Sequence, residues 1–167
     1  MALTQVIGDG LATSGLPAGS VVQVVNVIDS AVASTSTTLT NDDSIPQNTE
    51  GGEFMTLAIT PTSATHKLLI EVVVHGSPNG AAAVTSALFQ DTTANALSAT
   101  GVYMGTGTGQ SPISFQHYMT AGTTDSTTFK VRVGAHSGNF TFNGTNNSTR
   151  IYGGVAASSI TIMEIAV

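Results

Sequence analysis

The chain has 167 residues, of which 41% are hydrophobic and only 8% are charged, and its formal net charge is −6. This length fits one domain with a full hydrophobic core, so wholesale disorder is excluded. The four basic residues form no cluster that could bind nucleic acid. The lack of cysteine excludes disulfides and zinc–thiolate sites. No apolar run is as long as a membrane helix.

Residues 1–19 are predicted to form an N-terminal arm, because Gly8, Gly10, Gly15, Pro17 and Gly19 interrupt any long regular element. The arm also carries apolar residues that a solvated tail does not need: Leu3, Val6, Ile7, Leu11 and Leu16. Two interpretations stay open, an arm that docks on a neighbouring subunit and an ordinary frayed terminus. The first ten residues lack the pattern of a signal peptide, so we expect synthesis in a cytoplasm.

Strands are expected from residue 20 onward, because β-branched residues and alternating apolar positions dominate there. In the first half, the pattern predicts strands over residues 21–28, 31–40, 53–60 and 67–75, with a loop over 41–52 and a turn over 61–66. The strand over 31–40 is rich in Ser and Thr and is expected to be exposed. The strand over 67–75 is apolar on both faces, which is typical of a central strand or of an intersubunit contact.

In the second half, a turn over 76–80 precedes strands over residues 82–90, 96–104, 113–119, 129–133, 140–142 and 160–167. Residues 82–96 also fit a short helix because of their alanine content, but their regular neighbours favour a strand. Phe129, Val131 and Val133 are expected to face the core, while Lys130 and Arg132 face solvent.

These nine to ten short strands predict an all-β fold, an antiparallel β-sandwich that is jelly-roll-like. The domain organisation that follows is an attachment arm over 1–19 and a β-sandwich domain over 20–167.

The sequence offers no convincing metal site. The four histidines, His66, His75, His117 and His136, lack the spacing of paired ligands on a strand. His75 and His117 are placed where they could approach a symmetry axis. Asp42 and Asp43 are hard-oxygen ligands in a loop, but adjacent carboxylates point in different directions and calcium needs six or more oxygens.

Catalytic patterns are also missing from the sequence. A glycosidase needs two carboxylates at a set separation, and the strand candidates are Glu53, Glu71 and Glu164, each alone on its strand. There is no Gly-x-Ser-x-Gly elbow, and the glycine-rich stretch over 105–109 lacks the lysine and helix of a phosphate loop. We therefore expect a protein that is not an enzyme, with no catalytic, cofactor-binding or metal-binding residues.

Three segments resemble bacteriophage tail-fibre and virion surface proteins. They are Leu16-Pro17-Ala18-Gly19-Ser20-Val21-Val22-Gln23-Val24-Val25, then Leu57-Ala58-Ile59-Thr60-Pro61-Thr62-Ser63-Ala64-Thr65-His66-Lys67-Leu68-Leu69-Ile70, and finally Ser158-Ser159-Ile160-Thr161-Ile162-Met163-Glu164-Ile165. The resemblance implies a jelly-roll-like domain that is commonly trimeric, and it brings no shared catalytic residues. Residues 76–150 carry no matching motif, and the long repetitive shaft of such fibres is missing.

The leading hypothesis is therefore a homotrimeric virion structural protein, a capsid decoration protein or short fibre subunit, attached to capsid or tail proteins through residues 1–19. The alternative is a module that binds host-surface glycan, for which Tyr103, Tyr118 and Tyr152 are the available tyrosines and tryptophan is lacking. A hydrolase has no specific support. Neither nucleic acid nor membrane insertion is expected.

Overall fold

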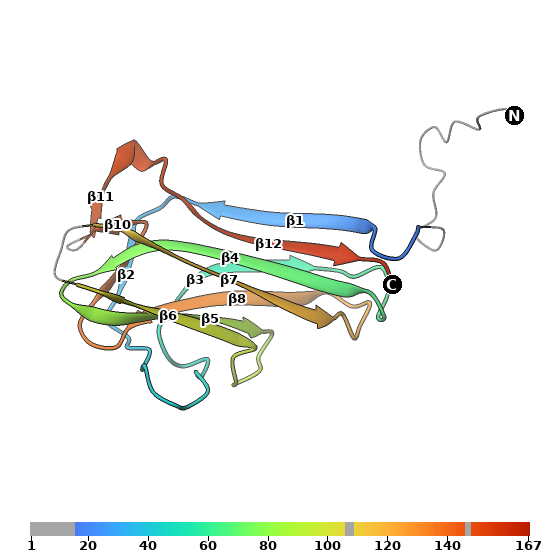
Figure 1. Cartoon of the computed structure of the whole chain (residues 1–167), viewed down its shortest axis with the longest axis horizontal. Coiled ribbons are helices and arrows are strands. Elements are labelled where there is room, and N and C mark those ends of the chain that lie inside the picture. Colours follow the sequence, from blue (N-terminus) through green and yellow to red (C-terminus); the bar gives the residue numbers. More distant parts are fainter. Residues whose placement is uncertain (1–15, 106–108, 146–147) are drawn as a thin grey trace, which may run out of the picture.

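Twelve β-strands account for most of the regular structure in this computed structural model, which describes residues 16–105, 109–145 and 148–167 (Figure 1). The first sheet contains six strands: β1 (Val21–Asp29), β12 (Ser158–Ile165), β4 (Lys67–Pro78), β9 (Phe140–Phe142), β2 (Ala33–Thr35) and β7 (Ser111–Thr120). The second sheet contains four: β3 (Gly52–Ile59), β8 (Thr127–Ala135), β5 (Ala82–Gln90) and β6 (Ser98–Met104). A two-stranded ribbon and a 3-10 turn complete the description: β10 (Gly144–Thr145), β11 (Thr149–Arg150) and η3 (Tyr152–Gly154).

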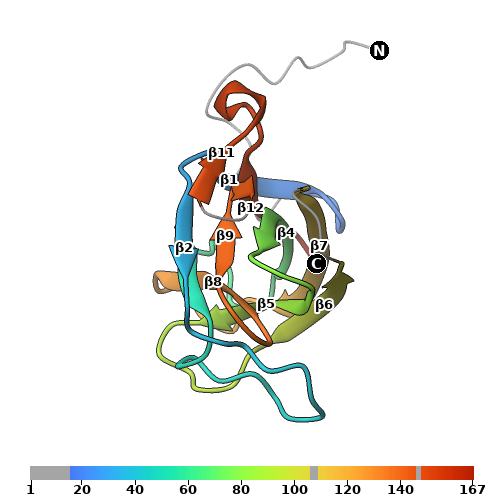
Figure 2. The ribbon, with the colours of Figure 1, turned by 90° about the vertical axis from the view of Figure 1, so that its left-hand side faces the viewer.

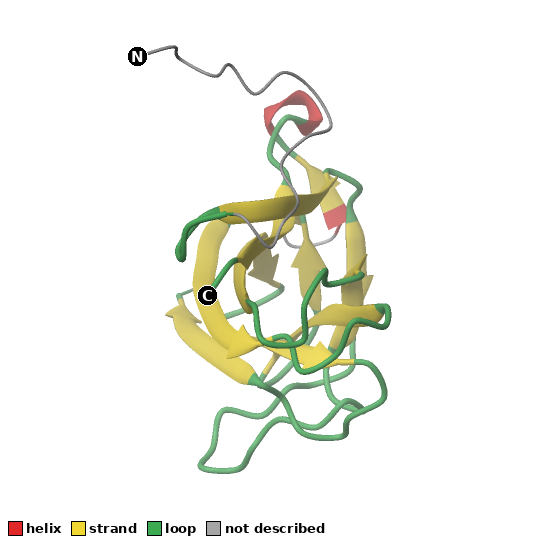
Figure 3. Ribbon diagram, turned by 90° about the vertical axis from the view of Figure 1, so that its right-hand side faces the viewer, coloured by secondary structure: helices red, strands yellow, loops and turns green. Residues whose placement is uncertain are grey.

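The eight long strands pair from the two ends of the chain inward, the first with the last and the middle two with each other. β1 pairs with β12, β3 with β8, β4 with β7 and β5 with β6, all antiparallel, and successive pairs alternate between the two sheets. This order is that of a jelly roll. The end-on views show the strands curling around one interior (Figures 2 and 3). The predicted antiparallel β-sandwich is confirmed.

The main core fills the space between the sheets. Each long strand contributes alternate residues, as the two-residue period of a pleated strand requires. Phe129, Val131 and Val133 of β8 are fully buried there, as predicted, opposite Leu68, Ile70 and Val72 of β4, while Lys130 and Arg132 point outward. The strand prediction for 82–90 and the central place of β4, between β12 and β7, are also confirmed.

Two local predictions were wrong. The turn expected over 76–80 begins later, because β4 runs on to Pro78 and its last three residues pair with β9. Gly76 permits this pairing, since a Cβ there would collide with the Phe140 ring and the Thr141 carbonyl. The exposed strand expected over 31–40 shrinks to β2, and Leu39 is fully buried.

Most of the predicted arm, residues 1–15, lies outside the described residues. The last part of the arm is held beside the end of the chain, because the Gly19 N–H donates to the Ala166 carbonyl at 2.8 Å. Within the described ranges, no helix has the length and apolar character needed to cross a membrane.

Candidate functional site

The three motif segments meet at one buried carboxylate, Glu164 on β12, which has no exposed surface. Its Oε1 accepts hydrogen bonds from the Thr62 N–H and hydroxyl, both at 2.8 Å, and lies 2.7 Å from His66 Nδ1. Its Oε2 accepts from Gln23 Nε2 at 2.6 Å. Gln23 belongs to the first segment, Thr62 and His66 to the second, and Glu164 to the third. We call this set of residues the Glu164 knot.

The Glu164 knot explains how the charge is tolerated inside the protein. Burial raises the pKa of the Glu164 carboxyl, but the hydrogen bonds from Gln23, Thr62 and His66 outweigh burial and leave the pKa below its usual value. A buried charge is stable only when it is paired and hydrogen-bonded. The motif therefore has a structural meaning: it ties β1, the turn before β4, and β12 together. The sequence showed Glu164 as a lone glutamate on a strand and gave no sign of this burial.

The other predicted site residues do not gather. Glu53, on the outer face of β3, pairs with Arg132 at 3.3 Å, while Glu71 lies on the outer face of the other sheet. His117 lies on the inward-facing side of β7, where burial lowers its pKa. The described residues contain no group of three or more His, Asp or Glu side chains that could hold a metal ion.

The outer face of the second sheet is covered by the chain itself, and we call it the covered face. The segment over residues 36–51 crosses it, with Leu39 packed on Ala87 and Phe89 of β5. Gly134 of β8 allows this approach, because a Cβ there would lie 2.7 Å from the Leu39 nitrogen. Arg132 secures the end of the segment by donating to the carbonyls of Glu50 and Gly51, each at 2.7 Å.

The outer face of β1, β12, β4 and β7, which we call the open face, has a different character. One row across these four strands is apolar: Val24 pairs with Met163, Met163 with Leu69, and Leu69 with Tyr118. Val24 and Tyr118 remain 54% and 56% exposed, and Ile28 on the same face is 68% exposed. Large apolar side chains aligned on an exposed sheet face mark an interaction surface.

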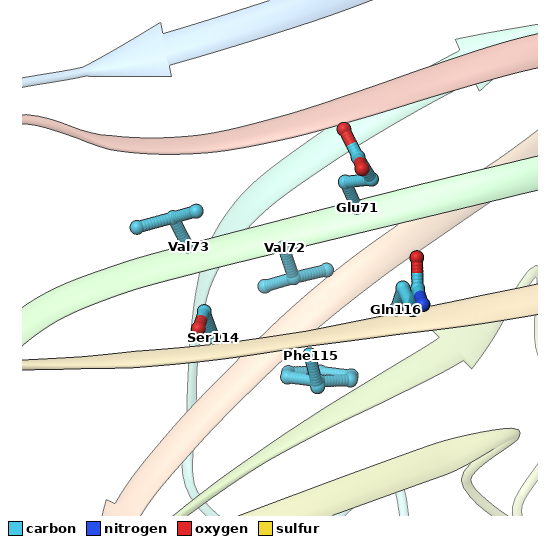
Figure 4. A pocket seen from close by; sticks show the side chains of 6 residues that line it. All are labelled: Glu71, Val72, Val73, Ser114, Phe115 and Gln116. Atoms are coloured by element: carbon cyan, nitrogen blue, oxygen red, sulfur yellow. The ribbon is translucent and has the colours of Figure 1, made fainter.

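A hollow of about 390 Å³ lies on the β4–β7 half of the open face. Figure 4 shows its lining from two adjacent strands: Glu71, Val72, Val73, Ser114, Phe115 and Gln116. Glu71 and Gln116 are opposite each other in the strand register, and neither side chain has a hydrogen-bond partner among the described residues. Tyr118 is two residues beyond Gln116 on the same face, about 7 Å along the strand. On the outer face, Glu71, Gln116, Val73 and the Tyr118 ring thus adjoin one another, while the side chains of Val72 and Phe115 point toward the core.

Comparisons with known proteins give no family. No protein-family model matches the chain, and no curated protein matches it. Solved structures with some likeness include dimeric latent PorU from Porphyromonas gingivalis, with 8% identity and a TM-score of 0.42 over 92% of this chain and 14% of that one. The infectious bursal disease virus VP2 subviral particle has 13% identity and a TM-score of 0.35, over 87% of this chain and 38% of that one. The enzymatically active domain of bacteriophage CBA120 tailspike protein 4 has 13% identity and a TM-score of 0.32, over 86% of this chain and 19% of that one.

The chain therefore spans between 14% and 38% of the length of these three proteins. All three TM-scores lie below 0.5, so the likenesses assign neither a family nor a function. The chain's own residues, above all the Glu164 knot and the open face, are the basis for a functional proposal.

Proposed function

We propose that this chain is a non-enzymatic structural subunit of a bacteriophage virion, a capsid decoration protein or short fibre subunit, that assembles with copies of itself through the open face. The observation that carries the proposal is the apolar row Val24, Met163, Leu69 and Tyr118 on a sheet face that stays exposed. The motif resemblance supplies the class of particle and the expectation of three copies.

The size and chemistry of the open face support a contact with another copy. The four strands are 8 to 12 residues long. At a spacing of about 4.8 Å they span roughly 600 Å², to which the flanking edge of β1 adds. Specific interfaces bury about 800 Å² on each partner, so the face supplies much of that area. Charged groups on it are few, chiefly Lys67 and Glu71, which suits the depletion of charge at interface centres.

The edge of the sheet supports the same proposal. β1 has nine residues with no proline, and its only charged residue is Asp29 at its end. It pairs with β12 on one side. A long edge strand with little charge invites pairing with another chain unless something covers it. A second copy seated against β1 and the open face protects both.

The test is the mass of the full chain in solution, measured by light scattering or native mass spectrometry. We expect three times the chain mass, and we expect Val24→Asp with Ile28→Asp to give a folded monomer. Ala99→Asp, which places the same charge on an exposed position of the second sheet, is the matched control and should leave the mass unchanged. A parent chain that is monomeric and does not bind purified phage particles contradicts the proposal.

A second candidate function, recognition of a neutral saccharide, is favoured by Tyr118 beside the hollow of Glu71 and Gln116. Sugars bind where an aromatic face adjoins a few convergent polar groups. An array of neutral and acidic oligosaccharides tests it: neutral sugars should bind, and Tyr118→Ala should abolish binding. Tyr103→Ala is the control, because Tyr103 is also exposed but lies on the second sheet. An array without a binder excludes this function.

A further inference from the structure

The free edge of β1, the strand that ends the first sheet, is a place where a further strand can be added. β1 pairs with β12 on one side, and within the described ranges no other strand pairs with it. It lies along the rim of the molecule (Figure 1). An edge strand presents a row of unused N–H and C=O groups, and these pair readily with another extended segment.

β1 also carries exposed apolar side chains. Val21, Val24 and Ile28 are 52%, 54% and 68% exposed. Edge strands are usually protected from unwanted pairing by charged residues or proline, and β1 has only Asp29, at its last position. A strand added about 4.8 Å from β1 would place its own side chains against Val24 and Ile28. The edge therefore suits an uncharged, apolar strand.

The chain contains a segment of matching character in residues 2–7, Ala2-Leu3-Thr4-Gln5-Val6-Ile7. These six residues include no charge, no glycine and no proline, and their apolar and β-branched side chains favour a strand. Such a strand would be roughly 20 Å long. The segment lies outside the described residues, but the described residues that follow it restrict what it can reach.

The connection from this segment to β1 consists of residues 8–16, which we call the tether, followed by a tight turn. In the turn, the Ser20 N–H donates to the Pro17 carbonyl at 3.1 Å, and Gly19 has a φ of 88°. A positive φ at the third of the four turn residues is typical of a type II turn. The Gly19 N–H and the Ser20 carbonyl then bond to Ala166, which fixes the turn at the start of β1.

This turn makes β1 of the same chain a poor antiparallel partner for residues 2–7. In a hairpin, paired residues lie equally far from the turn, so the tether would lie beside β1 and residues 2–7 would pass beyond its end. The tether contains Gly8, Gly10 and Gly15, and glycine weakens a strand. A type II turn also splays the two strands of a hairpin, which favours type I′ or II′ turns instead.

Parallel pairing within one chain is also unfavourable. It requires a crossover of roughly a dozen residues or more, usually with a helix in it. Only the nine residues of the tether separate Ile7 from the turn, and three of them are glycine. The extended tether nevertheless spans about 30 Å, which is about the length of β1 itself. A neighbouring copy that packs against the open face is within that reach.

We propose that residues 2–7 of one copy form a strand on the free edge of β1 in a neighbouring copy. This inference rests on the proposed self-association and names the segment that completes the contact. The exchanged strand covers the exposed side chains of β1 and widens the first sheet by one strand. Each copy gives one such strand and receives one, so a closed ring of three copies leaves no β1 edge free.

Photo-crosslinking of the full chain tests where residues 2–7 bind. A benzoylphenylalanine in place of Gln5 should crosslink to β1 on illumination. The same group in place of Tyr103, which is exposed on the second sheet, is the control and should not. Oligomers assembled from a mixture of nitrogen-15-labelled and unlabelled chains show, by mass spectrometry, whether the two crosslinked peptides come from different copies. We expect pairs of mixed label, and pairs from one chain only overturn the proposal.

Charge placed in the segment gives a second readout. Leu3→Asp with Ile7→Asp should weaken self-association by about a hundredfold or more, because two apolar side chains lose their burial. Ala12→Asp with Ser14→Asp puts the same charge in the tether and should leave the mass unchanged. Hydrogen exchange of the β1 amides should become faster in the first variant only, while circular dichroism shows both variants folded.

The outcomes separate this inference from the proposed function. A monomeric parent chain removes the self-association on which the inference rests. An oligomeric parent whose mass and β1 exchange are unaffected by Leu3→Asp with Ile7→Asp overturns the strand exchange alone. Crosslinks from position 5 to purified phage particles but not to β1 also overturn it, because the segment would then bind another virion protein.

Discussion

The two outer faces of this jelly roll are built from similar strands but have different surroundings. On the covered face, Leu39 from the segment over 36–51 packs on Ala87 and Phe89, so β5 is buried on both sides. On the open face, Val24, Ile28 and Tyr118 stay more than half exposed. The chain thus covers one apolar face itself and leaves the other exposed, which is the face that we propose for self-association. Four predictions test this difference, from the largest expected effect to the smallest.

Leu39→Ala should destabilise the folded chain by about 3 kcal/mol, because it removes a fully buried leucine from the covered face. Leu69→Ala, the same change on the open face, should cost the isolated monomer about 1 kcal/mol, since Leu69 is only half-buried. Urea unfolding of both variants in a monomeric background measures the two losses. Equal losses would show that the two faces are covered to the same degree.

Arg132→Gln should cost about 2 kcal/mol, because two charge-assisted hydrogen bonds to the Glu50 and Gly51 carbonyls are lost. Lys130→Gln is the matched control: Lys130 lies 3.8 Å from the exposed Glu53 carboxylate, and such pairs contribute little. Hydrogen exchange should show the segment over 36–51 opening in the first variant only. Equal opening in both variants would contradict the anchoring role of Arg132.

Acid should destabilise the strands of the open face before it destabilises those of the covered face. The pKa of Glu164 in the folded chain is below its unfolded value of about 4.3, so its stabilising contribution is full above that value and is lost as pH falls through the folded pKa. Protonation loosens the bond to Gln23 on β1. Hydrogen exchange at decreasing pH should show β1 losing protection before β5, and Glu164→Gln should remove this pH dependence. Loss of protection in β1 and β5 at the same pH in the parent chain would contradict this prediction.

Ile28→Thr should have the smallest effect on the monomer, within about 0.5 kcal/mol, because Ile28 is 68% exposed. The same change should weaken self-association, since it removes apolar area from the proposed interface. Sedimentation velocity over a range of concentrations measures the second effect, and urea unfolding of a monomeric background measures the first. A large loss of monomer stability would mean that Ile28 contacts something within its own chain.

Local pattern was a good guide wherever a strand has one buried face. The alternation of Phe129, Val131 and Val133 with Lys130 and Arg132 predicted β8, because side chains of a strand alternate between its faces. It failed where a distant segment decides the environment. Leu39 looked like part of an exposed Ser/Thr-rich strand, yet β5 and β8 bury it. Gly76 suggested a turn, yet it continues β4 because Phe140 lies against it.

The candidate sites also divide into what a local pattern shows and what only distant segments decide. The three motif segments were visible in the sequence, but only the fold brings Gln23, Thr62 and His66 onto Glu164. Asp42 was considered as an ion ligand and discounted, because adjacent carboxylates point in different directions and calcium needs six or more oxygens. A sequence shows which residue types are present, whereas a site depends on distances between strands that are far apart along the chain.

By itself, then, the sequence determined the all-β class, the position of most strands and the lack of a catalytic motif, since these follow from composition and from the two-residue period. The tertiary structure decided which faces are covered and which carboxylate is buried. Burial depends on the pairing of strands such as β1 with β12 and β5 with β8, and long-range register of this kind is not encoded in any local pattern.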